Sequence, residues 1–309
     1  MMLKTSTGNP HLYLPDADVD GIVKMFKEAG LDGVDFSFYD MRLGSYPFGR
    51  DFFKKDVEEL KSILKVYKDA FAKYGISVPQ THAPAPIYKF DPNEQEFNDY
   101  LLETTKKCIE LTAWLDSKYI VVHPAHDSSR ILYDEERRTN IKFFSKIIDT
   151  ARRFNVTVCL ENMWADKGGK IFDSSCSDPY EACDYIDTLN DMAGEELFAF
   201  CFDVGHANIC GRHMQNTLRV LGKRVKTLHI HDTDGMNDNH TVCYACASPG
   251  GRPMTDYEGF LAGLRDIGYD GYLNFEVVSA FNIFPKPTHQ ALCKLIKATG
   301  DYFSSQIEK

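Results

Sequence analysis

The 309-residue chain is 43% hydrophobic and carries a formal net charge of −10 at neutral pH. That length allows a substantial hydrophobic core, and no segment approaches the roughly 18 apolar residues of a membrane-spanning helix. Because the acidic balance gives no general attraction for polyanions, we expect no nucleic-acid partner. The lack of such a span, and of a charged leader followed by a long apolar stretch, predicts no membrane contact and a cytoplasmic location. The nine cysteines are odd in number, and several lie in apolar runs, which favours reduced thiols.

Short apolar runs alternate along the chain with segments of helical periodicity. The apolar runs predict strands at residues 4–7, 33–38, 76–82, 118–123, 156–161, 197–203, 225–231 and 271–277. The intervening segments predict helices at 16–29, 52–74, 94–115, 134–154, 179–189, 214–221, 256–267 and 288–303. In chain order, each predicted strand is followed by one predicted helix.

The strand runs are rich in Val, Ile, Leu and Phe with little polar alternation, which is typical of parallel strands covered by helices on both faces. Eight such units in a chain of this length predict an α/β fold, a (β/α)8 TIM barrel, as one domain over 1–309. A doubly wound open sheet is the alternative, but the glycine-rich turn of a dinucleotide site does not follow the first strand. Two long insertions, 39–51 and 231–255, are expected at the C-terminal face.

Four of the predicted strands carry, at or near their C-terminal end, a residue of a type that binds metals or transfers protons. Because the C-terminal ends of barrel strands surround one pocket, we expect these four residues to converge there. Three carboxylates and one imidazole favour Mn²⁺, Mg²⁺ or Co²⁺ over a tetrahedral structural zinc. The four candidate metal ligands are Glu161, Asp203, His229 and Glu276.

A second set of polar residues lies at or just beyond the strand ends. They are expected to reach the same pocket, either as additional metal ligands or as partners of the first set. This set consists of His82, His123, His206, Asp238 and His240.

The motifs T-H-A-P, V-H-P-x-H, L-E-N, F-D-V-G-H, H-I-H-D-T-D-G and G-Y-D-G-Y-L-N-F-E-V resemble the xylose-isomerase-like barrel superfamily. This superfamily joins sugar isomerases and epimerases with the endonuclease IV family, and the resemblance covers about residues 3–280. The resemblance to its ketose 3-epimerases implies one divalent metal on the four candidate ligands, with Glu161 and Glu276 as the proton-transfer pair. His206 would then bind substrate hydroxyls.

His231 competes with His229 as the ligand, because residues two apart on a strand share a face. We prefer His229, since the H-x-x-D pattern formed with Asp232 is closer to the endonuclease-like branch, and we place His231 among the substrate-binding candidates. Endonuclease IV holds three zinc ions with nine residues, and this chain has a counterpart for each. Against that activity stand the acidic charge and the sequence after His240, T-V-C-Y-A-C-A-S-P-G-G-R-P, which replaces the expected glycine-rich stretch.

The leading prediction is therefore a metal-dependent carbohydrate isomerase or epimerase, with Mn²⁺ as the expected metal and Zn²⁺, Co²⁺ or Mg²⁺ as alternatives. A divalent ion stabilises the enediolate that forms when a carbon beside a sugar carbonyl loses its proton. The alternatives are a zinc phosphoesterase on abasic DNA, a dehydratase or carbon-glycoside lyase, and a non-catalytic sugar-binding subunit. The superfamily resemblance also suggests a homo-oligomer.

Three smaller features complete the predicted site. Trp164 follows the fifth strand and is a candidate for stacking on a sugar ring, although rim aromatic residues more often pack. Arg252 is a candidate for binding an anionic substrate group, with a surface loop charge as the alternative. Cys243 and Cys246 form C-x-x-C, but a zinc clip normally needs a second pair.

Overall fold

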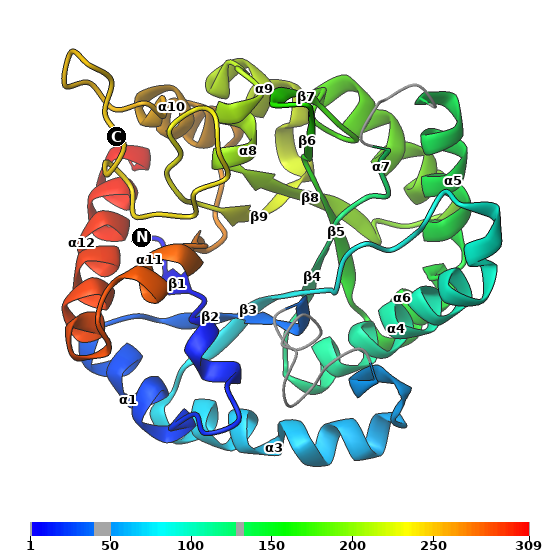
Figure 1. Cartoon of the computed structure of the whole chain (residues 1–309), viewed down its shortest axis with the longest axis horizontal. Coiled ribbons are helices and arrows are strands. Elements are labelled where there is room, and N and C mark those ends of the chain that lie inside the picture. Colours follow the sequence, from blue (N-terminus) through cyan, green and yellow to red (C-terminus); the bar gives the residue numbers. More distant parts are fainter. Residues whose placement is uncertain (1, 40–50, 128–132, 309) are drawn as a thin grey trace.

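In the computed structural model, which describes residues 2–39, 51–127 and 133–308, eight parallel strands form a barrel inside a ring of helices (Figure 1). The strand order is β10-β1-β2-β3-β4-β5-β8-β9. A parallel bridge between Ile230 and Phe275 joins the two ends of this sheet. The eight strands are β1 (Thr5–Thr7), β2 (Gly33–Ser37), β3 (Ser77–His82), β4 (Tyr119–Val122), β5 (Thr157–Glu161), β8 (Phe198–Asp203), β9 (Val225–His229) and β10 (Leu273–Phe275).

This order confirms the predicted TIM barrel and excludes the doubly wound sheet, because neighbouring strands follow the chain all the way round. The outer ring contains α1 (Val19–Ala29), α3 (Val57–Tyr74), α4 (Gln95–Trp114), α5 (Tyr133–Ser145), α6 (Ile148–Phe154), α7 (Pro179–Ala193), α9 (Met214–Leu221), α10 (Tyr257–Ile267) and α12 (His289–Ile307).

Capping side chains explain where two helices begin later than predicted. Asp18 accepts a hydrogen bond from Gly21 N at 2.9 Å, and Asp56 accepts one from Glu59 N at 2.8 Å. An N-terminal aspartate satisfies backbone donors that have no partner within the helix, so α1 and α3 start directly after these residues. The predicted helix 134–154 is two helices, since the chain turns between α5 and α6.

Several short elements were not predicted. Two of them lie at the C-terminal ends of strands: a hairpin of β6 (Trp164–Lys167) and β7 (Lys170–Asp173), and the helix α8 (Val204–Ile209). The others are α11 (Val278–Ile283) and the 3-10 turns η1 (Pro10–Tyr13), η2 (Phe52–Lys54), η3 (Pro92–Glu94), η4 (Gly222–Arg224) and η5 (Lys286–Thr288). Residues 40–50 of the first predicted insertion lie outside the described residues.

The core has two parts. A small cluster of Val121, Cys159, Ala199 and Cys201, from β4, β5 and β8, is separate from the large cluster that includes Phe26, Phe144, Phe200 and Phe260. All nine cysteines are free, as expected for reduced thiols. In the described part of the chain, no helix combines the length and apolar character needed to cross a bilayer.

Candidate active site

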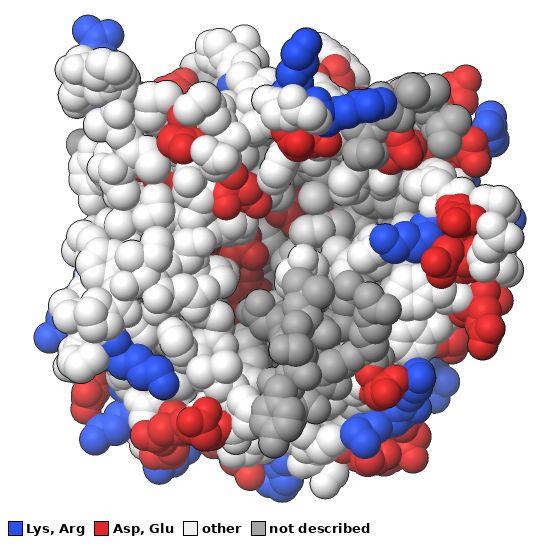
Figure 2. Space-filling view, viewed as in Figure 1, with Lys and Arg blue, Asp and Glu red and all other residues white. Residues whose placement is uncertain are grey.

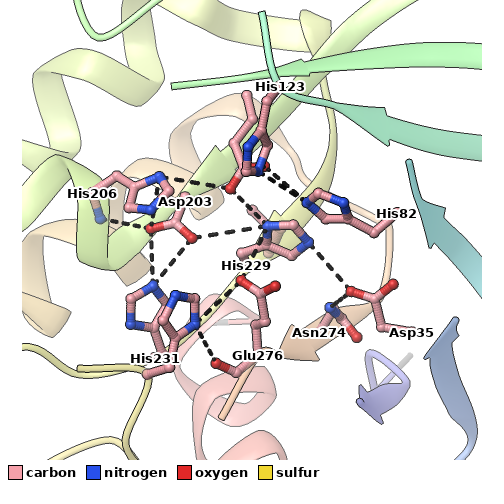
Figure 3. A network of polar contacts seen from close by, with 12 residues as sticks. Asp35, His82, His123, Asp203, His206, His229, His231, Asn274 and Glu276 are labelled. Carbon is pink, nitrogen blue, oxygen red and sulfur yellow. Dashed lines mark hydrogen bonds and ion pairs between the residues drawn. The ribbon is translucent and has the colours of Figure 1, made fainter. Parts of the chain in front are cut away.

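The barrel brings the four predicted ligands together at the C-terminal ends of its strands. Glu161, Asp203 and His229 are the last residues of β5, β8 and β9, and Glu276 directly follows β10. One donor atom from each of the four lies within 4.8 Å of one from each of the others. The convergence expected from the sequence is therefore present in the fold (Figure 3).

One imidazole nitrogen lies at the centre of this group. His229 Nδ1 is 2.8 Å from Glu161 Oε1, 3.5 Å from Glu276 Oε2 and 3.8 Å from Asp203 Oδ2. The side chains of His229 and Asp203 are fully buried and that of Glu161 is 1% exposed, whereas the Glu276 side chain is 19% exposed. Burial of so much negative charge is unfavourable unless protons or a cation balance it.

The pKa directions follow from this crowding. Burial would raise the pKa of Glu161, but the neighbouring His229 and His123 hold it well below its usual value. Burial likewise opposes a charged His229, yet the anionic surroundings, including Glu276 and Glu161, raise its pKa well above the usual value. Without a metal, these directions favour an ionised Glu161 beside a protonated His229.

A second group of potential ligands lies beside the first and comprises His206, His231, Asp238 and His240. Asp238 Oδ2 is 2.9 Å from His240 Nε2 and 3.4 Å from His206 Nε2. His231 Nε2 is 3.1 Å from both carboxylate oxygens of Asp203, which ties this group to the first.

A third group comprises His82, His123 and Glu161. The Nε2 atoms of the two histidines are 3.1 Å apart, and Glu161 Oε2 lies 3.1 Å from His123 Nε2 and 3.5 Å from His82 Nε2. Glu161 thus presents one oxygen to the first group and the other to this pair. In the predicted second set, His82, His123 and His206 lie near Glu161, and His240 lies 3.4 Å from Glu276. Asp238, the fifth member, contacts His206 and His240.

Several buried polar atoms here lack a hydrogen-bond partner among the described residues. They are Glu161 Oε2, His229 Nε2, His231 Nδ1, Asp238 Oδ1 and Asp35 Oδ1. Unpaired buried polar atoms are rare in folded proteins and often mark the place of an ion or ligand. Together with the carboxylate-rich donor set, they show that these side chains fit a divalent cation.

Local backbone features hold the ligands in place. Asp203 Oδ1 caps α8 by accepting the His206 backbone N–H at 2.6 Å. Asn162, just after β5, donates from Nδ2 to Asp203 O and accepts from Asp203 N, each at 2.8 Å. Gly205 makes room for His231, since a Cβ at this position would lie 1.9 Å from His231 Cε1.

The insertion after β9 is anchored by Asp232, which is fully buried. Its carboxylate accepts hydrogen bonds from Cys246 N at 2.8 Å, Thr255 Oγ1 at 2.6 Å and Thr233 N at 3.1 Å. These bonds fix both ends of the loop that carries Asp238 and His240. The H-x-x-D pattern is thus partly structural, because its aspartate holds the loop.

A cavity of about 470 Å³ opens over the candidate ligands. Its described lining includes no Lys or Arg, and Figure 2 shows Asp and Glu atoms in the central hollow while Lys and Arg lie toward the edge of the view. Such a lining disfavours anionic substrate groups. Its carboxylates come from Asp35, Glu161, Asp166, Asp238 and Glu276.

The substrate-binding candidates fall in different places. His206 and Trp164 line the cavity, and Trp164 begins the β6–β7 hairpin. His231 is fully buried on Asp203 and does not line the cavity. Arg252 lies exposed on the insertion, where its backbone pairs with Ser248, and it is not part of the described lining.

Two residues of this site went unnoticed in the sequence. Asp35 interrupts the apolar run of β2, and its side chain is 3.3 Å from His229. A single acid inside a buried strand was the available signal. Asn162 follows Glu161 directly, so the L-E-N motif contains both a candidate ligand and the residue that holds Asp203.

A family model described as a xylose isomerase-like TIM barrel matches residues 23–298. Uncharacterised protein MJ1311 of Methanocaldococcus jannaschii is 27% identical over 203 residues, 63% of this chain and 62% of that protein. Inosose isomerase of Bacillus licheniformis is 21% identical over 188 residues, 61% of this chain and 64% of the enzyme. Probable endonuclease 4 of Shouchella clausii is 26% identical over 190 residues, 58% of this chain and 60% of that protein. Each match spans less than two thirds of the relative's length.

Solved structures share the whole architecture. The 3-keto-D-glucoside 4-epimerase YcjR from E. coli superposes with a TM-score of 0.66 and 18% identity, covering 96% of this chain and 98% of that chain. The IolI protein with a bound zinc atom gives a TM-score of 0.68 and 16% identity, covering 97% and 98%. At these identities the likeness establishes the fold.

Proposed function

This chain belongs to the xylose isomerase-like TIM barrel family, and we propose that it is a divalent-metal-dependent sugar isomerase or epimerase. The observation that carries the proposal is the convergence of Glu161, Asp203, His229 and Glu276, whose donor atoms lie within 4.8 Å of one another. The inosose isomerase and the sugar epimerase that this chain resembles agree with this chemistry.

These four side chains would hold the metal, with Mn²⁺ as the preferred ion and Zn²⁺, Co²⁺ or Mg²⁺ as alternatives. A bound divalent ion would polarise the sugar carbonyl and stabilise the negative charge that develops there. Carboxylate oxygens favour Mn²⁺ and Mg²⁺, and the single imidazole also accommodates zinc and cobalt.

Glu161 and Glu276 are the proposed proton carriers. The lowered pKa leaves Glu161 ionised at neutral pH and thus able to accept a proton, and the same shift makes it a weaker base than a carboxylate with a pKa near neutrality. Glu276 is the more exposed of the two and lines the cavity, where it can reach a substrate carbon. Removal of a proton by one carboxylate and its return by the other gives epimerisation. A single carboxylate that moves the proton to the neighbouring carbon gives isomerisation.

The other proposed roles follow from position. His206 and Trp164 face the cavity, so we assign them to a sugar hydroxyl and to the sugar ring face. His231 does not line the cavity, and its Nε2 atom lies 3.1 Å from Asp203 Oδ1. We therefore assign it to holding Asp203 in place and not to binding substrate. Elimination from the same enediolate would give a dehydratase or carbon-glycoside lyase with the same residues.

A zinc phosphoesterase acting on abasic DNA is the second candidate. Three adjacent groups of potential ligands favour it, because they provide sites for more than one ion. The absence of Lys and Arg from the described cavity lining weighs against binding a phosphate backbone. Elemental analysis with about three zinc ions per chain, together with incision of an abasic duplex, would support the phosphoesterase.

The experiment that tests the main proposal is metal removal and restoration during sugar turnover. We expect a chelator to abolish conversion of neutral ketoses or inososes, and Mn²⁺ or Co²⁺ to restore it. Full activity after complete metal removal would contradict the proposal. Metal binding without conversion of any sugar in a broad panel would instead indicate a non-catalytic sugar-binding protein.

A further inference from the structure

Asp35 is a buried carboxylate on the side of His229 that faces away from the other carboxylates. It lies in β2 and is 4% exposed. Its Oδ2 atom is 3.3 Å from His229 Nε2 (Figure 3). The other ring nitrogen, His229 Nδ1, lies 2.8 Å from Glu161 Oε1. The imidazole is therefore held between two carboxylates that approach opposite nitrogens.

Side chains from β3 and β10 fix the orientation of the Asp35 carboxylate. Asn274 Nδ2 of β10 donates to Asp35 Oδ2 at 2.7 Å, and Gln80 Nε2 of β3 donates to the same oxygen at 3.1 Å. Ser6 Oγ of β1 donates to Asn274 Oδ1 at 2.7 Å, which fixes the amide orientation. Residues of β1, β3 and β10 thus supply a network of hydrogen bonds that ends at Asp35, beside His229.

Burial of the Asp35 carboxylate costs folding free energy, which an interaction with the His229 imidazole would offset. A buried carboxylate with one oxygen lacking a hydrogen bond is unfavourable, and Asp35 Oδ1 is such an atom among the described residues. At 3.3 Å, the contact of Oδ2 with His229 Nε2 is a close charge contact without a formed hydrogen bond. A histidine that binds a metal through one nitrogen usually donates its other N–H to a carboxylate or carbonyl.

We propose that Asp35 is a positioning residue, which accepts the Nε2–H of His229 and keeps Nδ1 turned toward the metal site. This inference rests on the proposed metal-dependent function. Under this inference Asp35 increases metal affinity by orienting His229, and Gln80 and Asn274 contribute by orienting Asp35. If Asp35 acts in this way, its loss weakens metal binding whether or not Asp35 Oδ1 also contacts substrate.

The test compares Mn²⁺ binding and the visible spectrum of bound Co²⁺ in wild-type protein and in Asp35→Asn. The substitution keeps the shape and removes the charge. We expect Mn²⁺ affinity to fall by roughly 10- to 100-fold, the usual effect of losing such an outer partner, with a changed Co²⁺ spectrum. The matched control is Asp32→Asn, directly before the same strand, where the carboxylate accepts the Thr5 N–H at 2.9 Å. It should leave both readouts unchanged.

A second variant covers the case in which Asp35→Asn does not fold. Gln80→Met keeps the side-chain length and removes one donor to Asp35, so we expect a several-fold loss of Mn²⁺ affinity. If either folded variant bound Mn²⁺ as tightly as the wild type with the same Co²⁺ spectrum, the positioning role would be overturned, even if KM for a sugar rose. Wild-type protein that bound neither ion would overturn the proposed metal-dependent function, and this inference with it.

Discussion

His229 Nδ1 lies 2.8 Å from Glu161 Oε1, although β8 separates the strands that carry these two residues. The contact is possible because both side chains turn into the barrel at the same end of the sheet. Neither residue has this neighbour in sequence, since 68 positions separate them. The barrel topology thus brings together the Glu161 carboxylate and the His229 imidazole, on which the proposed chemistry depends.

Glu161→Gln tests the base and ligand role of this pair. The amide keeps the side-chain shape but cannot be ionised, so we expect turnover to fall by about 10³-fold, within the usual range for loss of a catalytic acid or base. Mn²⁺ content per chain should fall as well. Glu258→Gln, on the exposed face of α10, is the matched control and should keep wild-type activity. A Glu161→Gln protein with wild-type turnover would remove this residue from the mechanism.

Metal affinity should depend on pH with a definite sign. His229 and His206 have pKa values well above the usual value, and Glu276 and Asp238 raise the pKa of His240 to about 10 against the opposing effect of burial. A metal that binds His229 must therefore displace a proton at neutral pH. We expect Mn²⁺ affinity to increase from pH 6 to pH 8, by up to about tenfold per unit for each proton released.

Calorimetric titration in two buffers of different ionisation enthalpy measures that proton release directly. The metal-free protein should show the opposite trend in stability. Folding raises the pKa of His240 from its usual 6.5 to about 10. Protonated His240 therefore stabilises the fold fully below pH 6.5, and this stabilisation is lost as the pH rises through about 10. Mn²⁺ affinity that is constant across this range, with no proton release, would contradict the proposed protonation of the metal-free site.

The cavity lining predicts a preference for uncharged substrates. Five carboxylates and no Lys or Arg lie in its described part, so apart from the proposed metal and the histidines a phosphate group would meet repulsion with no Lys or Arg to pair with. We expect kcat/KM for a neutral ketose or inosose to exceed that for its phosphate by at least about tenfold, equivalent to roughly 1.4 kcal/mol. Comparison of each sugar with its phosphate under identical metal loading measures this ratio. A higher value for the phosphate would refute the electrostatic argument.

Asp232→Ala should destabilise the insertion that carries Asp238 and His240. The substitution leaves Cys246 N and Thr255 Oγ1 without their acceptor, and we expect unfolding free energy to fall by about 3 kcal/mol, as for lost hydrogen bonds to a buried charge. Urea unfolding, with limited proteolysis of the loop, measures the effect. The exposed Asp270→Ala is the control. Equal stability of the two variants would show that Asp232 does not anchor the loop.

The sequence predicted the barrel because its strands are continuous apolar runs and its helices have clear periodicity. The helix at Met214–Leu221 lies where it was expected. Strand ends were informative for a topological reason, since parallel strands in a barrel all deliver their last residues to one face. That rule alone brought Glu161, Asp203, His229 and Glu276 together.

Other features depended on contacts that no local pattern reveals. The sequence 164–173 is too polar to signal the β6–β7 hairpin, which pairs Trp164 with Asp173. Asp35 was missed because an acid within an apolar strand has no local partner, and its neighbours Gln80 and Asn274 come from other strands. Arg252 is not part of the described cavity lining, and the loop that carries it pairs with itself between Ala247 and Pro253.

Hydrogen exchange with solvent at the carbon beside a sugar carbonyl tests the central proposal most directly. Neutral ketoses and inososes would be incubated with the protein in deuterated water and followed by proton NMR. We predict loss of that proton signal only with Mn²⁺ or Co²⁺ present, with no loss after chelation or in Glu276→Gln. Exchange that persists after chelation, or metal-loaded protein that exchanges no proton in any of these sugars, would contradict a metal-dependent isomerase or epimerase.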